Sequence, residues 1–287
     1  MKKVGFIGVG IMGKSMARNL MKHGFEAHIY ARTKSKVEDV ISEGAVFHAS
    51  IPELVPACEA VITMVGFPPD VEEVYFSEHG VFTAAKEGQY LIDMTTTSPT
   101  LAEKIYKAAA EKGIHAVDAP VTGGDTGAKA GTLAILVGGD QADFDTLLPV
   151  FEAMGNNIRY MGAAGMGQHA KMANQIMIAG ALSGVCEAFR YAEAKGLDLQ
   201  TLFDAVSTGA AGSAQLSQQG KRILQDDFAP GFFMKHFIKD MKIAAEEAAY
   251  SRIHLDVLKT ALSNCEALEA QGDGNLGTQA LIRYYRQ

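Results

Sequence analysis

Cysteine is scarce in this sequence, and neither cysteine nor histidine is arranged as metal ligands usually are. Cys58, Cys186 and Cys265 lie far apart, and none belongs to a CxxC pair. The eight histidines form no HxxxH or similar spacing. These absences argue against a disulfide framework and a cysteine-based metal site, so we expect no metal and a reducing, cytoplasmic location.

Long apolar stretches and basic blocks are also absent. No run of about 20 apolar residues occurs, so we expect no membrane span. Lysine and arginine number 26 against 33 acidic residues, which gives a net charge of −7, and no basic block is present. Nucleic acid is therefore not an expected partner. Two lysines precede the N-terminal apolar run, but Gly8 ends that run too soon for a secretory signal.

The first half of the sequence alternates short apolar runs with helical stretches. This alternation is typical of a parallel sheet with crossover helices, and it predicts a doubly wound α/β domain of the Rossmann type over residues 1–163. The predicted strands cover residues 4–9, 27–30, 60–65, 90–94, 115–118 and 133–137. The predicted helices cover residues 12–22, 34–42, 99–111 and 143–154.

Strand patterns stop after Gly165. Residues 166–194 lack proline and are apolar on most faces, which predicts one helix about 43 Å long at roughly 1.5 Å per residue. We therefore expect an all-α second domain over residues 164–287 that includes this long helix between the domains. Because so apolar a helix needs cover on several sides, we also expect a homo-oligomer. Further helices are predicted over residues 200–207, 213–225, 237–251 and 255–270.

A GxGxxG turn lies near the N-terminus, in the run Gly8-Val9-Gly10-Ile11-Met12-Gly13. The pattern alone is a weak indication, but here it closes an apolar strand and opens a helix, as in dinucleotide-binding domains. Its first glycine permits the tight turn, its second lets the backbone approach a pyrophosphate, and its third allows close helix packing. The helix N-terminus offers unpaired N–H groups to the phosphates. A glycine-rich turn without a ligand is the alternative.

The end of the second predicted strand lacks the acidic residue that NAD-binding domains usually offer to the ribose diol. Arg32 and Thr33 follow this strand instead. A guanidinium and a hydroxyl favour a 2′-phosphate held by charge-assisted hydrogen bonds, so we expect NADP, with NAD as the alternative cofactor. A solvated basic loop is the other interpretation.

Two further features lie where substrate is expected. Thr122-Gly123-Gly124 follows a predicted strand, so its hydroxyl and backbone N–H groups can cradle a carboxylate, or it can be an ordinary turn. Lys171 and Asn174 lie three positions apart, on one face of the long helix. A buried lysine and amide are costly unless a ligand satisfies them, and burial lowers the pKa of a lysine toward neutrality. A snorkelling surface lysine is the alternative.

Four segments together resemble the β-hydroxyacid dehydrogenase family, which includes 3-hydroxyisobutyrate dehydrogenase and the reductases of tartronate semialdehyde, glyoxylate and succinic semialdehyde. They are residues 8–13, 118–139, 162–174 and 237–240. The second segment, DAPVTGGDTGAKAGTLAILVGG, follows the substrate-binding signature of the family. The resemblance covers essentially the whole chain, and the order and spacing of the segments agree with it.

This resemblance implies roles for individual residues. Lys171 resembles the catalytic lysine, the Thr122 loop resembles the carboxylate-binding loop, and Asn174 resembles the substrate-orienting amide. The family often has serine where Thr122 stands and a second asparagine where Gln175 stands, so the chemistry is expected to survive while substrate preference differs. The other implied contacts are Thr96 on the nicotinamide side, Val65 and Gly66 over the cofactor, Lys239 and Asp240 closing the site, and Phe232 as an apolar wall.

The expected activity is hydride transfer between NADP and a small β-hydroxy acid, or the corresponding aldehyde acid. In reduction the Lys171 ammonium gives a proton to the developing alkoxide, and in oxidation the neutral amine accepts the hydroxyl proton. One alternative is a non-catalytic dinucleotide-binding scaffold, which predicts a replaced lysine. An imine reductase on the same fold typically lacks that lysine. An oxidative decarboxylase resembling 6-phosphogluconate dehydrogenase needs a longer helical domain.

Overall fold

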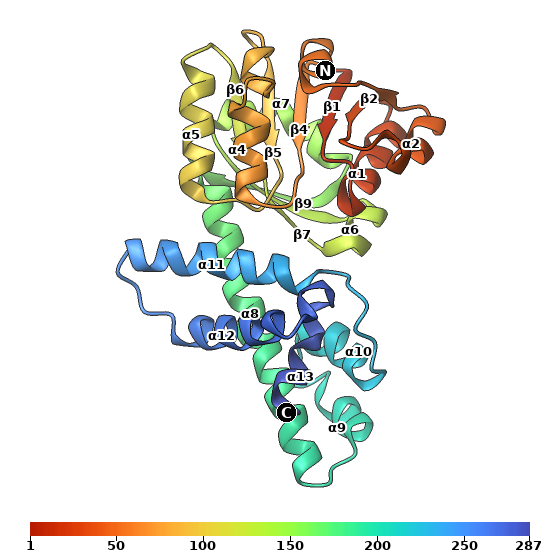
Figure 1. Ribbon diagram of the computed structural model, residues 1–287, viewed down its shortest axis with the longest axis vertical. Helices are drawn as coiled ribbons and strands as arrows, with labels where there is room; N and C mark the ends of the chain where they lie inside the picture. Colours follow the sequence, from red (N-terminus) through yellow and green to blue (C-terminus); the bar gives the residue numbers. More distant parts are fainter. The chain divides into compact units, whose positions relative to one another are not determined.

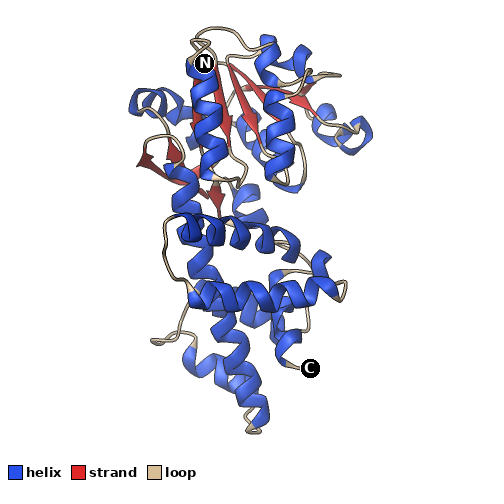
Figure 2. Cartoon of the chain, turned by 60° about the vertical axis from the view of Figure 1, so that its left-hand side comes forward, coloured by secondary structure: helices blue, strands red, loops and turns tan.

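The structure, a computed structural model, describes all 287 residues and contains two compact units. They are Met1–Lys171 and Met172–Gln287. The strands lie in the first unit and the second unit is built from helices, as Figure 2 shows. The division falls inside the helix α8, Met166–Ala194, whereas the predicted boundary lies ahead of this helix, at residue 163.

Nine strands form one sheet in the first unit. Its first six strands are mutually parallel in the order β3-β2-β1-β4-β5-β6, which is the order of doubly wound dinucleotide-binding folds. Strand β8 runs antiparallel to β6 and to β7, and β9 pairs with β8 in parallel. The strands are β1 Lys3–Ile7, β2 Glu26–Tyr30, β3 Val46–Phe47, β4 Ala60–Thr63, β5 Tyr90–Asp93, β6 His115–Asp118, β7 Val121–Thr122, β8 Leu133–Gly138 and β9 Gly155–Gly162.

Helices cover both faces of this sheet, so the central strands β1, β4 and β5 are buried on two sides (Figure 1). Successive side chains of a strand point to opposite faces. Phe6 accordingly packs in one core with Met16 of α1, whereas Ile7 packs in the other core with Tyr75 of α4. The helices of this unit are α1 Ile11–Lys22, α2 Glu38–Ser42, α3 Ile51–Leu54, α4 Pro68–Phe76, α5 Pro99–Ala110, α6 Gly124–Ala130 and α7 Gln141–Glu152.

The predicted elements of this unit do not include the shorter β3, β7, α3, α4 and α6, and the sequence pattern also fails for two longer segments. It does not predict β9, because Asn156, Asn157 and Arg159 are exposed polar residues and leave no apolar alternation to recognise. The predicted helix over residues 34–42 is interrupted, because the buried Val37 takes a φ of −125° and α2 begins only at Glu38.

The second unit packs its helices around one apolar core, in which Phe189, Phe237 and Leu268 are buried. The long predicted helix is confirmed as α8, while the predicted helix over residues 213–225 is a π-helical turn, Gln215–Gly220, followed by α10. No helix in the structure combines the length and apolar character needed to cross a membrane. The other helices are α9 Leu199–Val206, α10 Lys221–Leu224, α11 Met234–Tyr250, α12 Asp256–Ala270 and α13 Ile282–Tyr285.

Candidate active site

Most of the predicted site residues of the first unit lie at one edge of the sheet. Because β1, β2, β4, β5 and β6 are parallel, the loops that follow them leave from the same edge, where open α/β sheets bind ligands. A hydrogen bond joins two of these loops, since Val65 N donates to Thr95 Oγ1 at 3.0 Å. The predicted residues at this edge are Gly8, Gly10, Ile11, Met12, Gly13, Arg32, Thr33, Val65, Gly66 and Thr96.

The three glycines of the GxGxxG turn lie in different steric environments. Gly8 has a φ of +94°, and a Cβ there would lie 2.1 Å from Met64 O. A Cβ on Gly13 would lie 2.2 Å from Gly8 O, so this glycine allows α1 to pack closely. A Cβ on Gly10 would meet nothing within 4 Å, and no side chain caps the start of α1. The open space at Gly10 and the uncapped helix N-terminus therefore fit a pyrophosphate.

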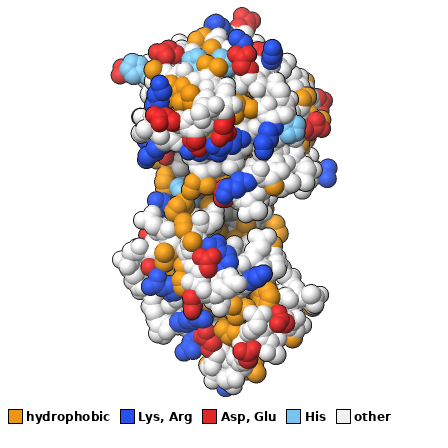
Figure 3. Space-filling view, turned by 90° about the vertical axis from the view of Figure 1, so that its right-hand side faces the viewer, with side chains coloured by type: hydrophobic (Ala, Val, Ile, Leu, Met, Phe, Trp, Pro, Cys, Tyr) orange, Lys and Arg blue, Asp and Glu red, His pale blue; other side chains and the backbone are white.

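Arg32 and Thr33 are exposed just after β2, and Arg32 forms no ion pair. Two cations of the neighbouring helix α1 are already paired with an acid. Lys14 and Arg18 bind Asp39 at 2.8 Å each, and together they lower the pKa of Asp39 to about 2. Figure 3 shows basic and acidic side chains intermingled on the surface of this unit. Arg32 is therefore a cation without an acidic neighbour, as a residue that receives a phosphate should be.

Lys171 is buried, with 7% of its surface exposed, and its amine faces the Thr122 loop. Nζ donates a hydrogen bond to Val121 O at 2.8 Å, and Val121 directly precedes Thr122. This burial does not fit a lysine that extends along the surface to reach solvent. The amine and the predicted carboxylate-binding loop are thus neighbours within the first unit.

The loop after Thr122 exposes backbone in a conformation that glycine favours. Gly123 and Gly124 have φ values of +127° and +62°. No atom lies within 4 Å of a Cβ placed on Gly124, so the space beside its backbone is open. A hydroxyl, accessible backbone and a buried amine therefore come together here, which is a suitable set of donors for a carboxylate and a reacting oxygen.

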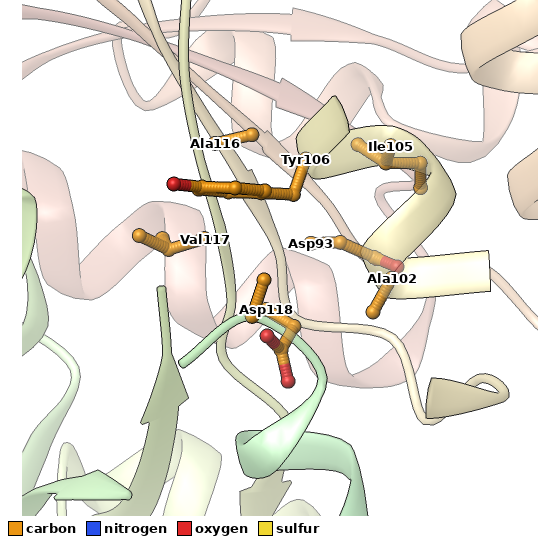
Figure 4. A pocket seen from close by; sticks show the side chains of 8 residues that line it. Asp93, Ala102, Ile105, Tyr106, Ala116, Val117 and Asp118 are labelled. Atoms are coloured by element: carbon orange, nitrogen blue, oxygen red, sulfur yellow. The ribbon is translucent and has the colours of Figure 1, made fainter. Parts of the chain in front are cut away.

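Sequence reasoning assigned no role to Asp118, yet this residue fixes the start of α8. Asp118 is the last residue of β6. Its buried carboxylate accepts hydrogen bonds from Gly165 N at 2.7 Å and Gln168 N at 2.8 Å. Burial raises the pKa of Asp118, and the two N–H donors oppose that shift. Figure 4 shows the carboxylate beside the chain segment that leads into α8. The sequence feature that could have indicated this role of Asp118 is its position as a carboxylate at the end of a predicted strand.

The sequence also did not predict a role for Gln168. Its side chain is fully buried and binds the backbone of the loop after β5, with Nε2 donating to Thr95 O at 2.7 Å. Nothing in the local sequence indicates this role, because the partner lies far away in the chain.

In the second unit, four predicted residues form one chain of contacts. Asn174 Nδ2 donates to Gln175 Oε1, and Gln175 Nε2 donates to Asp240 Oδ2, both at 2.7 Å. Lys239 Nζ lies 2.9 Å from Asp240 Oδ1. Phe232 is partly exposed and packs edge-on against Phe237, with ring centroids 6.1 Å apart. Both ends of the Gln175 amide are thus engaged by neighbouring side chains.

Two family descriptions match consecutive parts of the chain. Residues 3–162 match the NAD binding domain of 6-phosphogluconate dehydrogenase. Residues 165–285 match a domain described as NAD-binding of NADP-dependent 3-hydroxyisobutyrate dehydrogenase. The chain belongs to the β-hydroxyacid dehydrogenase family. Its predicted fold class, a Rossmann-type domain followed by a helical domain, is confirmed.

Several related proteins align with nearly all of the chain. An uncharacterised oxidoreductase of Bacillus subtilis (strain 168) is 50% identical over 99% of both chains. The 2-hydroxy-3-oxopropionate reductase of Escherichia coli (strain K12) is 36% identical, over 98% of this chain and 96% of the reductase. The structure of Mycobacterium tuberculosis 3-hydroxyisobutyrate dehydrogenase with L-serine covers 100% of both chains, with 31% identity and a TM-score of 0.91. The protein is therefore an NAD(P)-dependent oxidoreductase of the hydroxy-acid class, as predicted.

The different environments of Gly10 and Gly13 give a direct test of the cofactor site. Gly10→Ala should leave the free energy of unfolding within about 0.5 kcal/mol of wild type, because its methyl group meets no protein atom. The same variant should raise the dissociation constant for nicotinamide cofactor at least about tenfold, which is about 1.4 kcal/mol. Fluorescence titration and chemical denaturation measure the two effects.

Gly13→Ala is the matched control, because its methyl group would overlap Gly8 O and should destabilise the fold by about 1–3 kcal/mol. Unchanged cofactor affinity in Gly10→Ala would contradict this location of the pyrophosphate.

Proposed function

We propose that this protein is an NADP-preferring oxidoreductase that interconverts a short β-hydroxy acid and the corresponding aldehyde acid, with Lys171 as the general acid and base. The observation that carries the proposal is the buried Lys171 amine, 2.8 Å from Val121 O and next to the Thr122 loop. A proton-transfer group must lie within hydrogen-bond reach of the substrate oxygen, and a substrate bound by this loop brings its oxygen to the amine.

The partner of Lys171 suits a group that changes its protonation state. A carbonyl oxygen accepts an N–H from an ammonium and from a neutral amine alike. The bond to Val121 O therefore holds Nζ in the same position before and after proton transfer. In reduction the ammonium donates a proton to the forming alkoxide, and in oxidation the amine removes the hydroxyl proton.

The Thr122 loop would hold the carboxylate of the substrate. The Thr122 hydroxyl and the backbone beside Gly124 offer hydrogen-bond donors, and the open space at Gly124 allows a close approach. An anchored carboxylate fixes the reacting carbon and removes most of the entropy cost of its orientation. A bound nicotinamide supplies or accepts the hydride at that carbon. The named activities of the relatives, 2-hydroxy-3-oxopropionate reductase and 3-hydroxyisobutyrate dehydrogenase, support a short acid of this kind.

Removal of the amine tests the proposed proton transfer. Lys171→Ala should lower kcat by about 10²–10⁴-fold, the usual contribution of a general acid or base, while the affinity for NADPH stays nearly unchanged. Stopped-flow turnover with short aldehyde acids and fluorescence titration of NADPH measure the two quantities. Lys259→Ala, which removes an exposed lysine of α12, is the control. Retained turnover in Lys171→Ala would remove this residue from the mechanism.

Arg32 supports the preference for NADP, because it follows β2 without an acidic neighbour. Arg32→Ala should lower kcat/KM with NADPH about 10- to 100-fold, as expected for one charge-assisted phosphate contact, and should leave kcat/KM with NADH nearly unchanged. Lys22→Ala, at the far end of α1, controls for the loss of one positive charge. A wild-type enzyme with higher kcat/KM for NADH than for NADPH would contradict this preference.

We also propose that the second unit self-associates. Met177 and Tyr191 are large side chains of α8 that are 68% and 64% exposed although other residues of this helix are buried in the core, and a second copy of the chain would cover them. Met177→Lys should shift the protein toward monomer in sedimentation-velocity experiments without lowering its helix content. A wild-type protein that sediments as a monomer at micromolar concentration would contradict self-association.

A further inference from the structure

The fully buried side chain of Gln168 is not used by the mechanism proposed above. Its Nε2 donates to Thr95 O at 2.7 Å, and its Oε1 accepts from Thr97 N at 3.1 Å. The amide therefore bridges the backbone on both sides of Thr96, with 0% of its own surface exposed.

The first two turns of α8 are held to three places in the first unit. The backbone N of Gln168 donates to Asp118 at the end of β6, and its side chain binds the loop after β5. Lys171, three residues later on the same helix face, donates to Val121 of β7. One helical turn thus carries both the bridge around Thr96 and the buried amine.

We propose that Gln168 is a positioning residue that sets the separation between Thr96, on the nicotinamide side of the site, and the Lys171 amine. The inference rests on the function proposed above for Lys171 and on the family resemblance, which implies that Thr96 lies on the nicotinamide side. Hydride transfer and proton transfer act on adjacent atoms of one substrate, so the two partners must keep a fixed separation. A misplacement of about 1 Å can cost about a hundredfold in rate.

The chemistry of the bridge distinguishes positioning from packing. A backbone carbonyl and a backbone N–H face the side chain, so only a group with both a donor and an acceptor satisfies them. An apolar side chain of similar size would fill the same volume but leave Thr95 O and Thr97 N unpaired. The amide therefore specifies the path of the backbone at Thr96, which packing alone does not.

Gln168→Glu is the test, because the introduced carboxyl has nearly the same shape and switches its hydrogen bonding with pH. An ionised carboxyl can only accept hydrogen bonds. It therefore keeps the bond from Thr97 N, but its second oxygen faces the Thr95 carbonyl oxygen and repels it. When protonated it donates to Thr95 O and accepts from Thr97 N, which restores the bridge. Burial and the facing carbonyl raise the pKa of this carboxyl, which brings the switch toward the assay range.

We expect the kcat of Gln168→Glu to be about 10- to 100-fold below wild type at mildly alkaline pH, with the ratio of variant to wild-type kcat rising as the pH falls. The KM for the aldehyde acid should change little, and the isotope effect with NADPH deuterated at the transferred position should increase at alkaline pH. Gln168→Leu should lose activity equally at every pH. Gln225→Glu, at the exposed residue that follows α10, controls for the added charge.

Thermal unfolding of each variant at each pH separates activity from stability. A loss of activity in Gln168→Glu that is the same at every pH, or that follows the unfolded fraction, would assign Gln168 a structural role only and overturn the inference. That failure would leave the role of Lys171 intact, whereas turnover by Lys171→Ala would overturn the proposed mechanism itself.

Discussion

The buried carboxylate of Asp118 is the interaction on which the rest of the site depends. It ends β6 and accepts two backbone N–H groups from the start of α8. A buried charge is costly, but the N–H donors and the positive end of the helix dipole offset that cost. The carboxylate thereby attaches the long helix to the edge of the sheet where dinucleotides bind. Together with the bonds of the Gln168 side chain and of Lys171 to the first unit, this attachment fixes the start of α8 against the neighbouring strands.

The parts of the molecule that could be predicted from the sequence are those with a local pattern. Continuous apolar runs predicted the central strands, and the absence of proline over residues 166–194 predicted α8. Strand β9 was not predicted, because its exposed residues are mostly polar. The roles of Asp118 and Gln168 were not predicted for a different reason. Their hydrogen bonds join residues that are 47 and 73 positions apart in the sequence. A pattern of a few residues cannot reveal a partner that only the complete fold brings close.

Residues that share a motif can have unlike physical roles. Gly8 and Gly13 are required by the packing of the protein itself, whereas no protein atom lies close enough to Gly10 to require a glycine there. Gln175 is a similar case. The prediction of a substrate contact for Gln175 stays a prediction, and the structure adds that its amide binds Asn174 on one side and Asp240 on the other. Gln175 therefore also orders the side chains around it.

The division of the chain between Lys171 and Met172 has a consequence for how such enzymes can diversify. The residue proposed to move the proton is the last one of the unit that carries the cofactor turn, and Asn174 belongs to the other unit. The glycine-rich turn and the residue proposed to move the proton therefore lie in one contiguous stretch of chain. Changes confined to the helical unit that follows would leave both of them unaltered in sequence.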